Sequence, residues 1–359
     1  MKILFVTDFY NPHIGGVEKL FESLATKLVE EGHQVTFITL RYDKKLLHNE
    51  VQNGVNIIRI ASFSRTFFST IALPAIIKEA QKADLIHTST YSSAIGAWIA
   101  SIVTGKKIVI TVHEVWGKLW LDLPYLSKTT KVLFCLFEKS LLRLKFDQYI
   151  AVSESTKNEL LKQGISKSKV ETIYNGIQYN LPQWKGITEP FTFTFFGRGG
   201  VSKGLDLLID AANELHKTHP SVNYKFIISP QSESIFRTIT NKIRNSELNS
   251  VSTIYSNLPH QQLIDELTTS SCIIIPSYSE GFGFTAAEAS AMNIPIISSG
   301  KGSLPEVVSG KVITMSQLNS QSLVDAMKDA LQNKYEEIST KKFTIEEFVK
   351  RHLELYSKL

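Results

Sequence analysis

The stretch from Cys272 to Val308 constrains the fold more strongly than any other part of this sequence. It opens with a short β-branched run, Cys272–Ile275, which Pro276 ends, and this pattern predicts a buried strand. A glycine-rich turn follows, then a helix-compatible run of small residues, and then a second apolar run at 294–297. A strand, a turn, a helix and another strand in this order predict a parallel α/β sheet.

The turn Gly281-Phe282-Gly283 suits the binding of a phosphate group. Its glycines let the backbone approach an anion, and the N–H groups in the first turn of the following helix point towards it. Glu280 precedes the turn, and Glu288 lies in the helix eight positions later. A carboxylate repels phosphate, so Glu288 is better suited to accept hydrogen bonds from sugar hydroxyls, as in ribose recognition. The stretch therefore indicates a nucleotide site.

A second glycine-rich loop carries two cations. Phe191–Phe196 predicts a strand, and Gly197–Gly204 follows it as a loop that contains Arg198 and Lys203. Two cations five positions apart can neutralise a pyrophosphate and stabilise a nucleoside diphosphate as a leaving group. The alternative is a surface loop with two solvated cations.

The sequence gives no sign of a metal site. No Asp-x-Asp occurs in the chain, although a site that holds a divalent ion against a pyrophosphate would normally need such carboxylates. The 9 histidines show no ligand spacing with cysteine or acidic residues, so we predict no structural zinc. We therefore expect no metal and no cofactor, with side-chain cations as the partners of the phosphates.

At 359 residues the chain is long enough for two domains of ordinary size. Strand and helix patterns alternate through both halves, which predicts a first domain at 1–180 and a second at 188–342. The tail, 345–359, has the pattern of an amphipathic helix. Residues 41–75 carry no motif that we can interpret.

In the predicted first domain, three residues fall just beyond strand ends. Gly15 and Gly16 follow the strand predicted for Lys2–Phe9 and open a helix, and His113 follows the strand predicted for Lys107–Val112. Ligands bind beyond the carboxyl ends of parallel strands. His113 could hydrogen-bond a sugar hydroxyl, or it could be an ordinary hydrogen-bonded histidine at a strand end. The glycine pair could equally be a plain helix start.

The stretch 116–145 is rich in tryptophan, leucine, phenylalanine and basic residues. Residues 1–185 as a whole carry 23 lysines and arginines against 16 acidic residues, whereas the remainder carries 16 against 18. A basic amphipathic helix can lie on an anionic membrane surface. A helix that is apolar all round is typically buried, so we expect 132–137 to face the core of the first domain. The basic residues are not interleaved with aromatic residues in a nucleic-acid-binding module, so we expect no nucleic-acid partner.

Compartment signals favour the cytoplasm. Cys135 and Cys272 lie in apolar runs, which is typical of buried thiols in a reducing compartment. The first apolar run is too short for a signal peptide, and no apolar run approaches the roughly 20 residues of a membrane span. We expect a cytoplasmic protein, with peripheral attachment to the inner face of the membrane if 116–145 meets lipid.

Taken together, these motifs resemble those of the retaining nucleotide-sugar glycosyltransferases of family four (glycosyl transferases group 1). The resemblance implies the GT-B fold: two Rossmann-like domains that face each other across a central cleft, with a C-terminal helix that crosses back to the first domain. One departure is Gly199-Gly200, where an apolar residue is more usual. The motifs are Gly15-Gly16, His113, Gly197-Arg198-x-x-x-x-Lys203-Gly204, Pro276-Ser277-x-x-Glu280-Gly281-Phe282-Gly283, Glu288 and Gly302-Ser303-Leu304-Pro305-Glu306.

The resemblance also implies roles for these residues. Glu280 and His113 would act at the donor sugar, Glu288 at the ribose, and Gly15-Gly16 would close over the donor phosphates. The implied catalytic set is His113, Glu280, Arg198 and Lys203. The implied donor-binding set is Gly15, Gly16, Arg198, Lys203, Gly281, Phe282, Gly283, Phe284, Thr285 and Glu288.

The implied reaction moves a hexose-type sugar from a UDP- or GDP-linked donor to an acceptor hydroxyl, with retention and without a metal. The opening Thr7–Glu18 is similar to members that glycosylate lipid or polysaccharide precursors at the cytoplasmic membrane face. Glu280 as a nucleophile would fit the spacing, but we do not favour it. The alternatives are a sugar-nucleotide 2-epimerase on the same fold, and a GT-B partner protein without catalytic activity of its own.

Overall fold

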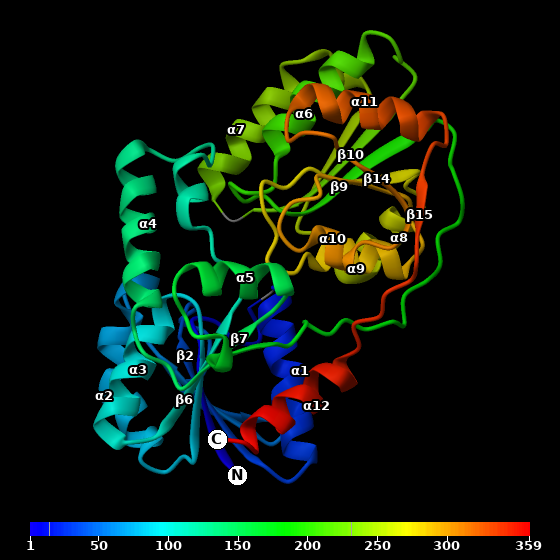
Figure 1. Ribbon diagram of the computed structural model, residues 1–359. Coiled ribbons are helices and arrows are strands. Elements are labelled where there is room, and N and C mark those ends of the chain that lie inside the picture. Colours follow the sequence, from blue (N-terminus) through cyan, green and yellow to red (C-terminus); the bar gives the residue numbers. More distant parts are fainter. Residues whose placement is uncertain (14, 231) are drawn as a thin grey trace. The chain divides into compact units, whose positions relative to one another are not determined.

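The computed structural model describes residues 1–359 except 14 and 231 (Figure 1). The described residues divide into two compact units, each with its own sheet. Unit 1 comprises Met1–Gly117, Val132–Ile177 and Phe343–Leu359, and unit 2 comprises Lys118–Lys131 and Gln178–Lys342.

In the described part of unit 1, eight strands form a sheet in the order β3-β4-β2-β1-β5-β6-β7-β8. Neighbouring strands run parallel, except that β3 pairs antiparallel with β4. The strands are β1 (Lys2–Val6), β2 (Gln34–Leu40), β3 (Asn49–Gln52), β4 (Val55–Ile60), β5 (Leu85–Ser89), β6 (Lys107–Val112), β7 (Gln148–Ala151) and β8 (Val170–Thr172). The helices are α1 (Gly16–Glu30), α2 (Phe68–Ala80), α3 (Ser92–Thr104), α4 (Lys128–Leu142, which belongs to unit 1 from Val132 on), α5 (Glu154–Lys162) and α12 (Ile345–Tyr356).

The alternation of side chains along β1 explains why helices cover both faces of this sheet. Successive side chains of a strand point to opposite faces. Leu4 and Val6 join a buried cluster with residues of α2 and α3. Phe5 instead stacks on Phe37 of β2 at 4.7 Å and lies edge-on to Phe21 of α1 at 5.8 Å, between ring centroids. A parallel sheet needs this burial on both faces, and the predicted α/β class is confirmed.

The stretch 41–75, which carried no interpretable motif, contains the β3–β4 hairpin. Asn53 and Gly54 connect the two strands with φ angles of 51° and 77°, as a type I′ turn requires. The Asn-Gly pair was therefore a usable hairpin signal. Arg59 of β4 is buried, and its guanidinium pairs with the carboxylate of Glu50 on β3 at 2.6 Å.

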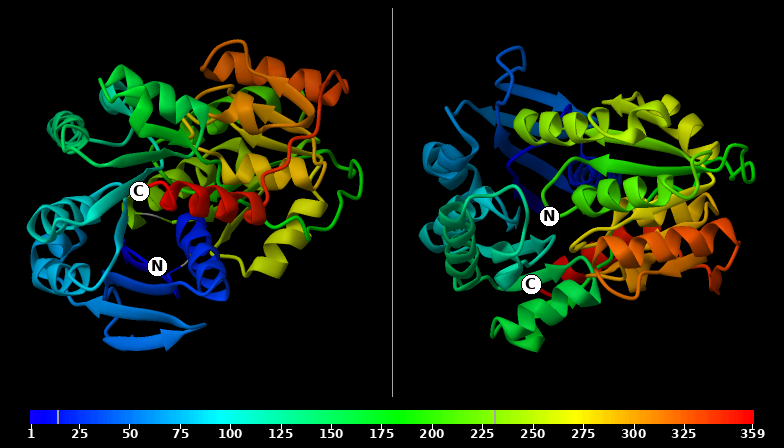
Figure 2. Two further views of the ribbon diagram at one scale, coloured as in Figure 1. Left: turned by 60° about the horizontal axis from the view of Figure 1, so that its bottom comes forward. Right: turned by 90° about the horizontal axis from the view of Figure 1, so that it is seen from above.

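The C-terminal helix α12 belongs to unit 1 and lies beside α1 (Figure 2). The hydroxyl of Tyr356 lies 2.5 Å from Nδ1 of His87 on β5. Where α12 begins, the backbone of Ile345 packs directly on Gly176, and a Cβ at that glycine would overlap it. The prediction that the last helix returns to the first domain is confirmed.

Two buried histidines, His352 on α12 and His87 on β5, should make the stability of unit 1 depend on pH. Burial lowers the pKa of His352 from 6.5 to about 4. Burial, and then the neighbouring His352, lower the pKa of His87 well below 6.5. The unfolded chain binds these protons more readily than the folded one, so stability is complete above pH 6.5 and is lost as the pH falls towards 4. Each histidine contributes about 1.4 kcal/mol per pH unit in that window.

We therefore expect His352→Leu to flatten the pH dependence of unfolding between pH 6.5 and 4 by about one proton. Urea unfolding across this range measures it. The control is His48→Leu, because His48 is an exposed histidine of the same unit. A His352 variant with the slope of the wild type would contradict the prediction.

In the described part of unit 2, seven strands form a sheet in the order β11-β10-β9-β12-β13-β14-β15, with β15 as an antiparallel edge strand. Helices α6, α7 and α11 cover one face, and α8, α9 and α10 cover the other (Figure 1). The strands are β9 (Thr192–Arg198), β10 (Asn223–Ser229), β11 (Ser252–Ser256), β12 (Cys272–Ile275), β13 (Ile296–Ser298), β14 (Gly310–Thr314) and β15 (Glu336–Ile338). The helices are α6 (Leu205–His216), α7 (Glu233–Arg244), α8 (His260–Thr268), α9 (Phe284–Ala291), α10 (Leu304–Val307) and α11 (Ser320–Leu331).

Helix α4 contradicts the expectation that 132–137 would be buried. Its inward face is formed by Leu141, Leu142 and Glu138, whose carboxylate accepts hydrogen bonds from Tyr91 Oη at 2.8 Å and from the backbone N–H of Trp116 at 3.0 Å. The rest of the apolar run therefore faces outward. The exposed large side chains are Val132, Leu133, Phe134, Leu136 and Phe137. Among the helices of the described residues, none is long and apolar enough to cross a bilayer.

Candidate active site

The candidate site of unit 2 begins where β9 and β12, which are parallel neighbours, end at the same edge of the sheet. The chain leaves β9 through the loop that contains Lys203 and leaves β12 through the segment that contains Glu280. The two segments touch: Tyr278 N–H donates to the carbonyl of Ser202 at 2.8 Å. Gly204 lies directly against the carbonyl oxygen of Pro276, with a φ of +67° that favours glycine. Residues about 75 positions apart in the sequence are thus held together by backbone contacts.

Glu280 is the buried carboxylate of this site, with 8% of its side chain exposed. Its Oε1 accepts hydrogen bonds from Lys203 Nζ and from Ser277 Oγ, each at 2.7 Å. A buried carboxylate needs such partners, because an unpaired charge away from water is costly. The structure therefore brings together Lys203 and Glu280, which the sequence placed on separate motifs. It also adds Ser277, to which sequence reasoning gave no role.

A third segment, which follows β13, contacts the backbone of Glu280. Ser303 N–H donates to the carbonyl of Glu280 at 2.9 Å. The backbone of Gly302, at a φ of +61°, packs so closely on that of Glu280 that a Cβ would overlap it. Ser299 Oγ donates to the carbonyl of Ser277 at 2.7 Å. The sequence contained Gly302-Ser303, but nothing local indicated that these residues would hold a carboxylate about 20 positions away.

The glycine-rich turn leads into α9 as predicted. Gly283, with a φ of +84°, precedes the helix, which begins at Phe284. The side chain of Thr285 lies beside Gly197 at the end of β9, where a Cβ would be 3.4 Å from Thr285 Cγ2. Glu288 lies one turn further along α9 and is half-buried. The first turn of α9 therefore meets the same edge of the sheet as the loop of Lys203, and its N–H groups are suited to an anion.

Arg198 occupies a slightly different position from the one predicted. We placed it in the loop after the strand, but β9 continues through Gly197 and Arg198, because this end of β9 pairs with Ile228 and Ser229 of β10. Its side chain is exposed, and among the described residues its guanidinium has no ion-pair partner. Arg198 is thus a cation at the strand end that a ligand can reach.

The predicted residues of unit 1 lie at the carboxyl edge of its own sheet. His113 directly follows β6, where its N–H lies 3.5 Å from Thr90 Oγ1 and its ring is edge-on to Phe21 at 6.1 Å. Gly15 precedes α1 in extended conformation, and Gly16 is the first residue of the helix. The carboxylate of Glu18 folds back over Gly15, so that a Cβ there would overlap it. Residue 14, in the same loop, lies outside the described residues.

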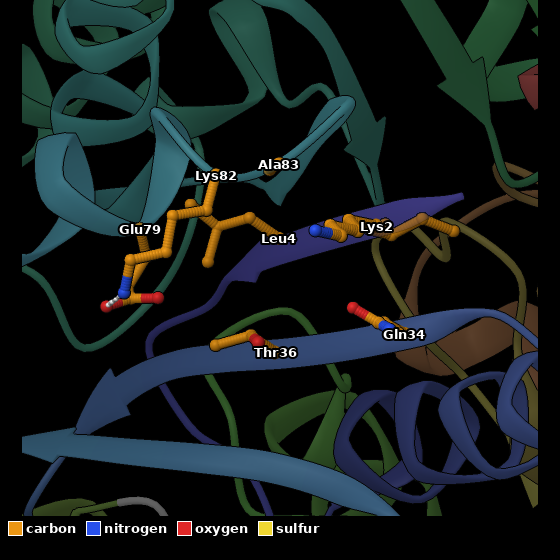
Figure 3. Close-up of a pocket in the computed structure, with 8 residues that line it drawn as sticks. Lys2, Leu4, Gln34, Thr36, Glu79, Lys82 and Ala83 are labelled. Carbon is orange, nitrogen blue, oxygen red and sulfur yellow. Dashed lines mark hydrogen bonds and ion pairs between the residues drawn. The ribbon is translucent and has the colours of Figure 1, made fainter.

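A hollow at the amino ends of β1 and β2 is lined by polar side chains that include Lys2, Gln34 and Thr36 (Figure 3). Lys82 and Glu79 form an ion pair beside it at 2.7 Å. Since ligands of parallel α/β sheets bind at the carboxyl ends of the strands, and none of the predicted site residues lines this hollow, we assign it no function.

Two parallel-rich α/β sheets, each flanked by helices, define a protein of the GT-B class. Solved structures agree: sucrose-phosphate synthase from Thermosynechococcus elongatus has a TM-score of 0.83 at 19% identity, covering 99% of this chain and 98% of that one. Anabaena HepE, solved in complex with UDP and glucose, has a TM-score of 0.75 at 18% identity and full coverage of both chains. The model of glycosyltransferase family 4 matches residues 14–181, and that of glycosyl transferases group 1 matches 180–345. The chain belongs to this glycosyltransferase family.

Curated relatives also match most of the chain. A phosphatidylinositol N-acetylglucosaminyltransferase subunit from Arabidopsis thaliana is 23% identical over 344 residues, which is 92% of this chain and 74% of that protein. Its counterpart from Homo sapiens is 24% identical, with 92% of this chain and 68% of that protein covered. An uncharacterized glycosyltransferase of Methanocaldococcus jannaschii is 28% identical over 87% of this chain and 84% of its own length.

Proposed function

We propose that the protein transfers a hexose-type sugar from a nucleoside diphosphate to an acceptor hydroxyl, with retention at the anomeric carbon. The observation that carries this proposal is the pairing of Lys203 with the buried Glu280 at 2.7 Å, next to the first turn of α9. A cation, a carboxylate and the N–H groups of a helix start, all at one sheet edge, can bind phosphate and sugar hydroxyls at the same time.

Each part of the site has a task in this reaction. Arg198, Lys203 and the N–H groups from Gly281 to Thr285 would bind the pyrophosphate and stabilise the negative charge that grows on it as the sugar leaves. Glu280 would accept hydrogen bonds from sugar hydroxyls, and Glu288 from the ribose. For Gly15-Gly16 and His113 of unit 1, roles at the donor phosphates and the donor sugar stay predictions from the family resemblance.

The charge on the leaving group would be neutralised by side chains rather than by a divalent ion. The support is chemical: the sequence has no Asp-x-Asp, and Arg198 and Lys203 lie at the same sheet edge as the phosphate-binding turn. Lysine and arginine can hold a diphosphate without a metal, as long as both lie within hydrogen-bonding reach of it.

The comparisons favour a UDP-linked donor and a lipid acceptor. A structural neighbour was solved with UDP and glucose, and relatives carry the name phosphatidylinositol N-acetylglucosaminyltransferase. We propose transfer of a sugar such as N-acetylglucosamine from UDP to a glycolipid or glycan precursor at the cytoplasmic face of a membrane. Those relatives are also named as subunits, so a non-catalytic role in an assembly is the second candidate function.

The test is a binding and transfer panel. Thermal unfolding is measured with UDP, GDP, ADP and their sugar conjugates, with and without EDTA, because a ligand of the folded state raises its stability by mass action. Release of UDP from UDP-N-acetylglucosamine is then measured with phosphatidylinositol vesicles. We expect stabilisation by UDP that EDTA does not change. Binding without turnover on any acceptor would favour the non-catalytic role, and binding abolished by EDTA would overturn metal independence.

We further propose that the exposed face of α4 attaches the protein to an anionic membrane. Leu133 and Phe137, like Val132 and Leu136, are spaced four apart and so lie on one side of the helix. Lys139 carries positive charge on the side of Val132 and Leu136, and Arg143 directly follows the last residue of the helix. An apolar face with basic flanks is the pattern of a helix that lies in the membrane interface.

We expect Leu133→Asp combined with Leu136→Asp to reduce binding to vesicles that contain an anionic phospholipid by at least about tenfold, since burying each carboxylate in the interface opposes insertion. Vesicle sedimentation measures it. The matched control is Leu47→Asp, because Leu47 is exposed to a similar degree (62% against 64% for Leu133) but precedes the opposite edge strand, β3. Equal loss in the control, or none in the double variant, would contradict the proposal.

A further inference from the structure

Glu280 has two carboxylate oxygens, and the structure uses them differently. Lys203 Nζ and Ser277 Oγ both donate to Oε1, each at 2.7 Å. Oε2 accepts no hydrogen bond from the part of the chain that the structure describes, and it is not among the buried atoms that lack a partner. One oxygen is therefore occupied by the protein, and the other is open to a ligand.

Ser277 is itself held firmly. The residue is 1% exposed, and it lies just beyond the end of β12, directly after Pro276. Its carbonyl accepts a hydrogen bond from Ser299 Oγ at 2.7 Å, so the backbone on which the hydroxyl is mounted is tied to the segment after β13. A neutral hydroxyl on a rigid strand end fixes its acceptor without competing for an anionic ligand.

Lys203 differs from Ser277 in this respect. Its side chain is 20% exposed and sits on a flexible four-carbon stem. A cation in this position can leave Glu280 for a more strongly charged partner, and the pyrophosphate of a donor is such a partner. Once Lys203 bonds the pyrophosphate, Ser277 is the remaining donor to Oε1.

We propose that Ser277 is a positioning residue that holds Glu280 by Oε1, so that Oε2 faces a hydroxyl of the donor sugar when Lys203 has turned to the pyrophosphate. This inference rests on the proposed function. In it, Ser277 never touches substrate and acts through Glu280 alone. It should therefore matter for the transfer step and not for the binding of a nucleoside diphosphate, which lacks the sugar.

The test compares Ser277→Ala, Ser277→Thr and a matched control, Ser270→Ala. Ser270 is fully buried at the opposite end of the same strand region, where its hydroxyl accepts from Thr194 Oγ1 at 2.7 Å and donates to the carbonyl of Glu266 at 3.0 Å. Thermal unfolding shows that each variant is folded. The readouts are kcat for UDP release from UDP-N-acetylglucosamine with phosphatidylinositol vesicles, and the dissociation constant for UDP.

We expect Ser277→Ala to lower kcat by about tenfold to a hundredfold, the usual effect of losing one hydrogen bond to a charged group, while the dissociation constant for UDP changes less than about twofold. Ser277→Thr, which keeps the hydroxyl, should restore most of the rate, and Ser270→Ala should leave both readouts near those of the wild type. An unchanged kcat, an equal loss of UDP binding, or an equal loss in the control would overturn the inference. A wild-type protein that neither binds a nucleoside diphosphate nor releases one would instead overturn the proposed function.

Discussion

Replacing Lys203 by methionine should lower the rate of sugar transfer by about 100-fold to 1,000-fold. The side chain keeps a similar length but loses the charge that would neutralise the departing pyrophosphate. It also loses its 2.7 Å ion pair with Glu280, whose side chain is only 8% exposed. The variant should therefore also be less stable, because a buried carboxylate is left with Ser277 as its donor. The rate of UDP release and urea unfolding measure the two effects.

A double variant separates these two effects. Adding Glu280→Gln to Lys203→Met removes the uncompensated charge, so stability should recover in part while transfer stays lost. Lys217→Met is the surface control, since its pair with Glu214 at 2.6 Å is largely exposed and should contribute little. If Lys203→Met kept more than about a tenth of the activity, the assignment of Lys203 to the leaving group would be wrong.

Much of the fold could be predicted from local patterns. The strands Lys107–Val112 and Cys272–Ile275 were predicted with the bounds that the structure has, because short apolar β-branched runs in a parallel sheet are buried on both faces. Helix α3 has no such pattern, because its residues are mostly small and apolar and the side chain of Tyr91 does not cap its first turn. No helix was therefore predicted for Ser92–Thr104.

The error at α4 has a different cause. A high content of apolar residues predicts that a helix is buried, but it does not show which elements of the fold are available to cover it. In the structure, Glu138 occupies the inward face by capping the N–H groups of Trp116 and Gly117. Glu138 directly follows the apolar run 132–137, and this charged residue, visible in the sequence, argued against burial of the whole run. What could not be seen was that its partners lie about 20 residues earlier.

The candidate site shows the same limit. The motifs gave each residue type and its strand, so Glu280, Lys203 and the turn before α9 could be expected near one sheet edge. The supporting contacts could not, because Ser303 reaches Glu280 through its backbone N–H. Backbone hydrogen bonds between loops depend on the register of two different strand ends and leave no local pattern in the sequence.

Gly204→Ala should be among the most damaging single substitutions in unit 2. At a φ of +67°, any L side chain is strained by about 1–2 kcal/mol. The added Cβ would in addition overlap the carbonyl oxygen of Pro276, which belongs to a backbone that cannot move without displacing β12. We expect a total destabilisation above about 3 kcal/mol, measured by urea unfolding with hydrogen exchange of β9 and β12 amides to assign the transition to unit 2.

Gly310→Ala isolates the effect of the overlap. Gly310 has a comparable φ of +79° in the same unit, but nothing lies within 4 Å of the position of its Cβ. The loss in free energy of unfolding in Gly310→Ala should therefore reflect the conformational strain alone. The difference between the losses in the two variants measures the effect of the overlap between residue 204 and Pro276. This contact joins the segment of Lys203 to the segment of Glu280, so Gly204→Ala should weaken UDP binding even at low temperature, where the variant is folded. Equal destabilisation by the two substitutions, or unchanged UDP binding in Gly204→Ala, would mean that the two segments are positioned by something other than their backbone contact.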